Sequence, residues 1–221
     1  MFSMITSAGL ARIAVVASVL LLAACGGGSD SGPLVAQLPD PPAKPAPPPP
    51  PPPELKLAES YTELIAGTID SQNHWPAWAG GGRNTIDGVA CLINEDYHIH
   101  ALLTIYKDGV RLAVPESVGR GGGGCTYELH THDKTGLIHI ETNVPKQFTL
   151  GQFFSVWRQP LTPTEAAGLP GQVRYYIIDD EKLTPYTGNP AEIELKAHRE
   201  VVIISGTPPE ELPKYRWPAG I

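Results

Sequence analysis

The fold and the candidate site both depend on the stretch Glu128-Leu-His-Thr-His-Asp-Lys-Thr-Gly-Leu-Ile-His-Ile-Glu141. Apolar and polar residues alternate over residues 129–132 and again over 137–140, which is typical of β-strands with one buried face. Between them lies Asp133-Lys-Thr-Gly136, a turn-rich tetrapeptide that ends in the glycine favoured by a positive φ. The stretch therefore predicts a β-hairpin.

The length of the hairpin loop decides which side chains share a face, because successive residues of a strand point to opposite sides of the sheet. A loop of two or four residues places His130 directly opposite His139. One face then carries Glu128, His130, His132, His139 and Glu141. The other face carries Leu129, Ile138 and Ile140. A loop with an odd number of residues would turn His139 to the apolar side.

A second pair of histidines occurs earlier in the chain, on the alternating segment 97–105. Lys107-Asp108-Gly109 follows it as the signal of another hairpin. Two histidines separated by one residue point to the same face of a strand, and neutral imidazole is the commonest protein ligand for transition metals. We therefore predict a metal site. The predicted ligands, not all on one ion, are His98, His100, His130, His132 and His139.

The other residues of this region narrow the choice of metal. Glu128, Asp133 and Glu141 are candidates to supply an oxygen ligand or to orient an imidazole. No cluster rich in methionine or cysteine is present, which argues against a Cu(I) carrier and against a blue-copper site. Zn(II) and Cu(II) fit the histidines and carboxylates better.

Two other functions compete with a simple metal-binding module. An ion held by three histidines with an open position could support hydration, hydrolysis or redox chemistry, with Asp133, Glu128 or Glu141 as general base. The chain has neither an H-E-x-x-H nor a G-x-S-x-G motif to support a particular reaction. Alternatively, the histidines form a hydrogen-bonded polar face of an interaction module of the cell envelope.

The amino end indicates export and anchoring. Residues 1–24 contain a lone Arg12 and a short apolar run, the pattern of a signal peptide. Leu22-Ala-Ala-Cys25 resembles a bacterial lipobox, which implies cleavage before Cys25 and its lipidation; an ordinary secretory signal is the alternative. Gly26 in place of a retention aspartate favours the outer membrane, with the domain facing the periplasm.

Residues 25–53 are predicted to be the lipidated cysteine and a disordered linker rich in glycine and proline. A polyproline II conformation would hold the following domain about 40–50 Å from its anchor. A ligand for a proline-recognising protein is the weaker interpretation. The sequence specifies no protein partner beyond the membrane and the metal ion.

Cysteine count and charge add two constraints. With Cys25 lipidated, Cys91 and Cys125 remain as an even pair in an oxidising compartment, which predicts a disulfide; thiolate ligation of a metal is the alternative. The formal net charge of −7 and the lack of a basic patch argue against a nucleic-acid partner.

Residues 54–221 are predicted to form a single domain. Many short strands separated by turn residues indicate a mainly β, antiparallel sandwich or barrel-like fold. One short helix is expected at about residues 149–158, because Thr149 and Gln152 make a capping box before an apolar run.

Four segments of the chain resemble a family of uncharacterised secreted bacterial proteins over roughly residues 97–206. The segments are Tyr97-His-Ile-His-Ala101, residues 129–141 with the pattern HTHDxxGxxHxE, Phe148-Thr-Leu-Gly-Gln-Phe-Phe154 and Leu195-Lys-Ala-His-Arg-Glu-Val201. The family has no established activity, so the resemblance implies the extent of the domain and the grouping of its motifs. It also adds His198 to the residues expected beside the metal ligands. Lys134 within the turn departs from the usual pattern.

Overall fold

The computed structural model describes residues 54–67, 74–121 and 124–221. The signal peptide at 1–24, the lipidated Cys25 and the linker up to residue 53 lie outside the described residues and stay predictions. Within the described ranges, no helix is long and apolar enough to cross a membrane.

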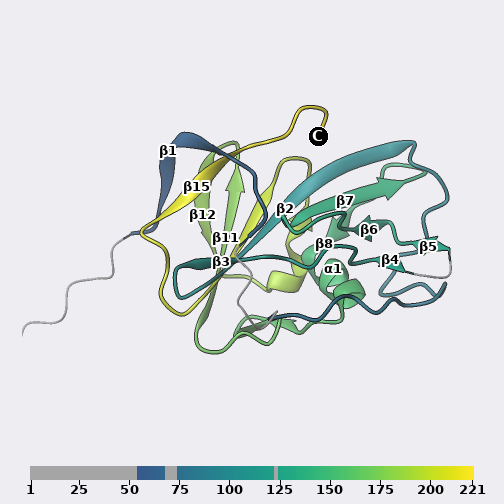
Figure 1. The fold of residues 1–221 in the computed structure, drawn as a ribbon, viewed down its shortest axis with the longest axis horizontal. Coiled ribbons are helices and arrows are strands. Elements are labelled where there is room, and N and C mark those ends of the chain that lie inside the picture. The colour runs from purple at the N-terminus through teal and green to yellow at the C-terminus, as the bar shows by residue number, and fades with distance from the viewer. Residues whose placement is uncertain (1–53, 68–73, 122–123) are drawn as a thin grey trace, which may run out of the picture. The chain divides into compact units, whose positions relative to one another are not determined.

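The largest sheet of the described chain has seven strands, in the order β12-β11-β14-β2-β7-β6, with β3 pairing to β2 (Figure 1). These strands are β2 (Tyr97–Lys107), β3 (Val110–Leu112), β6 (Leu129–His130), β7 (Leu137–Thr142), β11 (Val173–Asp179), β12 (Lys182–Tyr186) and β14 (Glu200–Ser205). The pairing of β14 with β2 is parallel, and the other pairings in this sheet are antiparallel.

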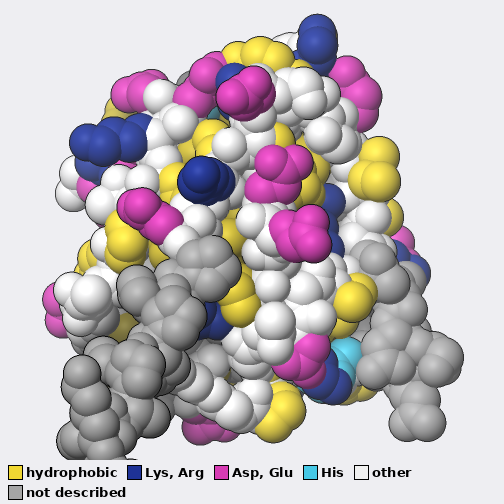
Figure 2. Space-filling model, turned by 90° about the vertical axis from the view of Figure 1, so that its left-hand side faces the viewer, with side chains coloured by type: hydrophobic (Ala, Val, Ile, Leu, Met, Phe, Trp, Pro, Cys, Tyr) yellow, Lys and Arg dark blue, Asp and Glu magenta, His cyan; other side chains and the backbone are white. Residues whose placement is uncertain are grey.

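Four two-stranded sheets complete the described domain. They pair β1 (Lys56–Glu63) with β15 (Glu211–Arg216), β4 (Arg120–Gly121) with β5 (Cys125–Thr126), β8 (Phe148–Thr149) with β13 (Glu194–Leu195), and β9 (Leu161–Thr162) with β10 (Glu165–Ala166). A 3₁₀ turn, η1 (Pro190–Glu192), precedes β13. The β1–β15 pairing is parallel. On the side of the domain that carries these two strands, acidic and basic side chains are interspersed (Figure 2).

The two faces of the large sheet contribute to different hydrophobic clusters, because successive side chains of each strand point to opposite faces. Leu103 and Ile105 of β2 lie in the main cluster, together with the aromatic residues of the helix. Tyr106 lies in a smaller cluster with Val202 and Ile204 of β14 and with Leu212 of β15. The described residues are mainly β, consistent with a sandwich, and their sheets do not close into a barrel. The predicted fold class is confirmed, with two parallel pairings among the antiparallel ones.

The α-helix of the described chain, α1 (Leu150–Trp157), lies where the capping box predicts it. Thr149 is the N-cap: its hydroxyl accepts a hydrogen bond from the Gln152 backbone N–H, and the Gln152 side chain accepts one from the Thr149 N–H. Arg158 ends the helix in the left-handed region, with φ of 63°. The buried face, Leu150, Phe153, Phe154, Val156 and Trp157, packs into the main core.

A disulfide joins Cys91 to Cys125, as the cysteine count predicts. The two residues are 34 positions apart in the sequence, so on chain-entropy grounds the crosslink stabilises the domain by about 4 kcal/mol. The same disulfide removes both cysteines from the set of possible metal ligands. The thiolate alternative is therefore excluded in this oxidised structure.

Candidate metal site

Strand register brings the two histidine pairs together. β7 lies between β2 and β6 in the sheet, and His139 of β7 is directly opposite His100 of β2 and His130 of β6. Two residues along the strands from this pair, and on the same face, His98 is opposite Glu141. Five imidazoles and one carboxylate thus lie on one face of three adjacent strands, once His132 of the following loop is included.

The predicted pairing of His130 with His139 is confirmed, but the predicted strand over 129–132 is too long. The ladder ends at His130, and an even number of residues, 131–138, lies between the paired His130 and His139, which keeps His139 on the polar face. The early end has a physical cause. Thr131 leaves the ladder because its backbone N–H donates to the Val118 carbonyl and its hydroxyl donates to the Pro115 carbonyl.

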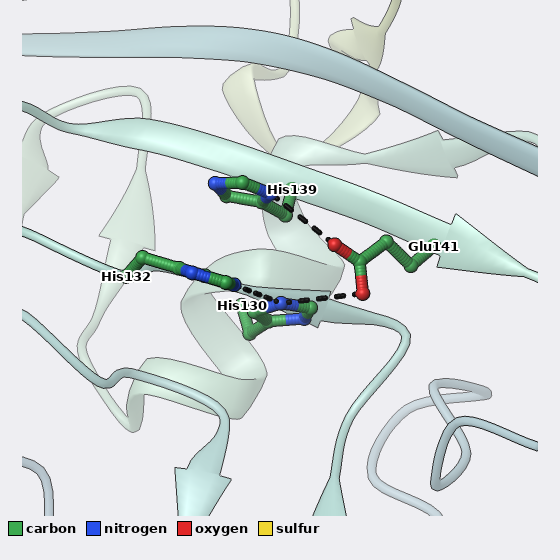
Figure 3. Close-up of side chains that lie close together, drawn as sticks. All are labelled: His130, His132, His139 and Glu141. Atoms are coloured by element: carbon green, nitrogen blue, oxygen red, sulfur yellow. Dashed lines mark hydrogen bonds and ion pairs between the residues drawn. The ribbon is translucent and has the colours of Figure 1, made fainter. Parts of the chain in front are cut away.

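His132 returns to the site although it lies outside the strand. Its ring stacks on that of His139, with centroids 4.0 Å apart, and its Nε2 lies 2.9 Å from Nε2 of His130 (Figure 3). His132 is exposed, whereas His130 is only 1% exposed. The site therefore has a buried inner part and a rim open to solvent.

The hydrogen bonds of His130 define its protonation. Nδ1 lies 2.8 Å from the Tyr127 carbonyl oxygen, which can only accept, so Nδ1 carries the proton and donates it. In the neutral ring Nε2 then has a lone pair. This lone pair faces His132 Nε2 and, at 3.5 Å, Oε2 of Glu141. An imidazole that donates one N–H to a carbonyl while its other nitrogen faces potential ligands is the usual arrangement of a metal-binding histidine.

His139 is the most crowded member of the cluster. Its Nδ1 lies 3.0 Å from His100 Nε2, 3.3 Å from His98 Nε2 and 3.2 Å from Glu141 Oε1. One ring nitrogen has either one proton or one lone pair, so it cannot satisfy three polar neighbours equally. The atoms converge as they would around a cation.

Burial keeps the inner imidazoles neutral. Desolvation, helped by the neighbouring histidines, lowers the pKa of His100 to about 4 and that of His130 to about 3. Burial also lowers the pKa of His132 and of His139 below the ordinary value of 6.5. At neutral pH these rings therefore offer lone pairs. Burial raises the pKa of Glu141, whose side chain is 5% exposed.

Within the described ranges, three groups of side chains place one ligand atom each within 4.8 Å of the others. The groups are His130, His132, His139 and Glu141; His98, His100 and His139; and Glu95, His98 and Glu141. Glu95 was not among the residues predicted from the sequence. It lies in the loop before β2, two residues ahead of Tyr97, and only the acidic pair Glu95-Asp96 beside the H-x-H segment could have drawn attention to it.

Two carboxylates predicted to support the ligands, Glu128 and Asp133, have other partners. Glu128 forms an ion pair with Lys146 at 2.7 Å and accepts a hydrogen bond from the Ala90 backbone N–H. Asp133 accepts hydrogen bonds from the backbone and hydroxyl of Thr135, which orders the turn.

His198 contacts the site through its backbone rather than its ring. Its backbone N–H donates to the His100 carbonyl oxygen at 2.9 Å, whereas its Nε2 lies 2.8 Å from the carbonyl oxygen of Ile221. The ring is also close to that of Trp217, with centroids 5.0 Å apart. His198 therefore fixes the backbone of a candidate ligand.

Comparison of the chain with known protein families, with curated proteins and with solved structures found no match. The site defines the chain as a β domain with buried His/Glu clusters that could bind a metal. The resemblance to a secreted bacterial family stays a prediction from the sequence.

Proposed function

We propose that the domain binds a divalent transition metal, Zn(II) or Cu(II), at the group formed by His130, His132, His139 and Glu141. The proposal depends on one observation: the lone pair of His130 Nε2 and the Glu141 carboxylate oxygen face each other at 3.5 Å. Two acceptors without a proton between them repel each other. A dication bound by both converts this repulsion into two coordinate bonds.

The ligand set supports the choice of ions. Imidazole nitrogen and carboxylate oxygen suit Zn(II) and Cu(II), whereas Cu(I) prefers thiolate and thioether ligands. Cys91 and Cys125 are joined to each other, so neither provides a thiolate. His132 and His98, at the exposed rim, give an ion a route to solvent.

The sequence indicates where in the cell the protein would bind the metal. The signal peptide, the lipobox at Cys25 and the proline-rich linker support a lipid-anchored protein of the outer membrane that faces the periplasm. A module with such an anchor and an accessible metal site would buffer, sense or transfer the ion in the cell envelope.

A metal-dependent enzyme is the second candidate function, because His98, His100 and His139 form a three-histidine group that shares His139 with the first group. Three protein ligands leave one position of a tetrahedral ion for water or substrate. Turnover of simple esters, CO₂ or phosphate monoesters by the loaded protein would favour the enzyme over the binding module.

Metal content is the direct test. The full-length chain would be exported to a periplasm, purified without a histidine tag, and analysed by plasma mass spectrometry beside a His130→Ala/His139→Ala variant. We expect stoichiometric Zn or Cu in the parent and its loss in a variant that keeps its far-ultraviolet circular dichroism. Absence of metal in the parent, with no thermal shift on adding Zn(II) or Cu(II), would leave the hydrogen-bonded interaction module as the function.

A further inference from the structure

We infer that the cluster holds two metal ions, one on His130 and His132 and the other on His98, His100 and His139, with the Glu141 carboxylate bridging them. This inference rests on the proposed function and extends it, and it moves His139 from the first ion to the second. It starts from the number of ligands: five imidazoles and one carboxylate converge, and a tetrahedral ion takes four ligands.

The second set has the spacing of ligands around one ion. Tetrahedral bonds of 2.0–2.1 Å place ligand atoms roughly 3.3 Å apart. Nε2 of His98 lies 3.3 Å and Nε2 of His100 lies 3.0 Å from Nδ1 of His139. The three nitrogens come from neighbouring strands of the ladder, so their positions are fixed by backbone hydrogen bonds.

His139 belongs to both groups by distance, but one nitrogen serves one ion. Its Nδ1 is the atom that contacts His98 and His100, which assigns this nitrogen to the second ion. The first ion then keeps His130 Nε2, His132 Nε2 and one oxygen of Glu141.

The Glu141 carboxylate lies between the two sets. Its Oε1 is 3.0 Å from His98 Nε2, and its Oε2 is 3.5 Å from His130 Nε2. Two oxygens of one carboxylate that face different nitrogen sets have the geometry of a bridge. Metal ions in two-metal sites lie about 3.5–4 Å apart, and a shared anion reduces the repulsion between them.

Glu95 adds a second carboxylate on the side of the second ion. It forms a group with His98 and Glu141, and its side chain is exposed. One dication among neutral imidazoles needs few anionic partners. Two adjacent dications benefit from both carboxylates, so the presence of Glu95 at this edge supports double occupancy.

Zinc stoichiometry tests the inference. Full-length protein would be stripped with chelator, loaded with excess ZnCl₂, desalted, and measured by plasma mass spectrometry and native mass spectrometry. The informative variants are His132→Asn and His98→Asn, because both side chains are exposed and their replacement leaves the core intact. His74→Asn is the control, since its ring lies beside Trp75 outside all three groups.

We expect two Zn per chain in the parent and in His74→Asn, and one in each of the other two variants. One Zn in the parent, lost from only one of the two cluster variants, would overturn the two-ion centre while leaving the proposed metal function intact. Two Zn in the parent that neither variant reduces would place an ion elsewhere and also overturn it. No Zn in the loaded parent, together with no Zn or Cu in the protein purified from the periplasm, would instead contradict the proposed function itself.

Discussion

His139 and His130 occupy the same rung of the β6–β7 ladder, with their rings 5.3 Å apart and nearly parallel at 14°. On its other side His139 is paired with His100 of β2. Each ring can contact the next because directly opposite side chains have Cβ atoms about 4.5–5.5 Å apart. His139 is therefore the residue through which the two histidine pairs meet.

Replacement of His139 should affect metal binding more than folding. His139→Ala removes a nitrogen that lies within 3.3 Å of two other imidazoles, so we expect Zn affinity to fall by more than about 100-fold. The metal-free variant should keep its stability to within roughly 1 kcal/mol, because a partly buried and crowded imidazole is lost together with its desolvation cost. Competition with a chromogenic chelator measures the affinity, and urea unfolding measures the stability.

His198→Asn is the matched control for His139→Ala, because asparagine tolerates the φ of 60° at this position. The His198 ring contacts Ile221 and Trp217 instead of the cluster, so its loss should leave Zn affinity unchanged. Equal losses of affinity in both variants would contradict the assigned ligands.

The sequence predicted the composition of the site because strand periodicity is local. Alternation and an even loop suffice to place His130 opposite His139. The adjacency of β2 to β7 is a long-range pairing, and nothing in the local pattern specifies that His100 lies opposite His139. The sequence therefore predicted which histidines belong to the site, but not the β2–β7 register that brings His98 and His100 to His139.

Long flexible side chains were the least predictable part of the site. Alternation puts Glu128 on the histidine face, but its carboxylate reaches Lys146 and the Ala90 backbone instead. Glu95 reaches the site from a loop, where periodicity gives no direction. The two-residue period of a strand predicts the side of the sheet to which each residue points. The partners of a charged side chain, in contrast, depend on tertiary contacts.

Glu200 gives the stability a pH dependence that is separate from the histidines. Burial raises the pKa of this carboxyl to about 7, although the Thr104 hydroxyl donates a hydrogen bond to it at 2.6 Å. The folded state therefore binds more protons than the unfolded state between the ordinary carboxyl pKa of 4.5 and about 7. Its contribution to the free energy of unfolding decreases as pH rises through this window, by on the order of 3 kcal/mol.

Glu200→Gln should remove this contribution. In urea unfolding of the metal-free protein, the free energy of unfolding of the variant relative to the parent is expected to increase from pH 5 to pH 7.5. The comparison cancels the histidines, whose lowered pKa values act in both proteins with the opposite sign. A difference between variant and parent that stays constant with pH would show that Glu200 does not titrate in this range.

The disulfide should contribute to stability through the loop that it closes. Cys91 and Cys125 connect the loop before β2 to the segment that leads into β6, where Cys91 also forms a β-bridge with Tyr127. Cys91→Ser/Cys125→Ser should lower the free energy of unfolding by about 4 kcal/mol. Guanidinium unfolding with and without reductant checks this: the parent should approach the variant on reduction, and the variant should be insensitive to it.

Gly136 immediately precedes β7, the strand that carries His139, and its replacement should uncouple β7 from β2. Its φ is +86°, and a Cβ there would collide with the Leu103 carbonyl oxygen, while the Leu103 N–H donates to the Gly136 carbonyl. We expect Gly136→Ala to cost more than about 3 kcal/mol and to weaken Zn binding, because the rung of His100 and His139 lies three residues further along β7. Gly168→Ala is the control: its φ is +70°, but no atom lies within 4 Å of the added Cβ, so only the backbone cost of about 1–2 kcal/mol applies. Chemical unfolding and Zn titration of both variants separate the two effects. Similar losses of stability in both would mean that the backbone at Gly136 moves away from Leu103, and that the register of the histidines does not depend on this contact.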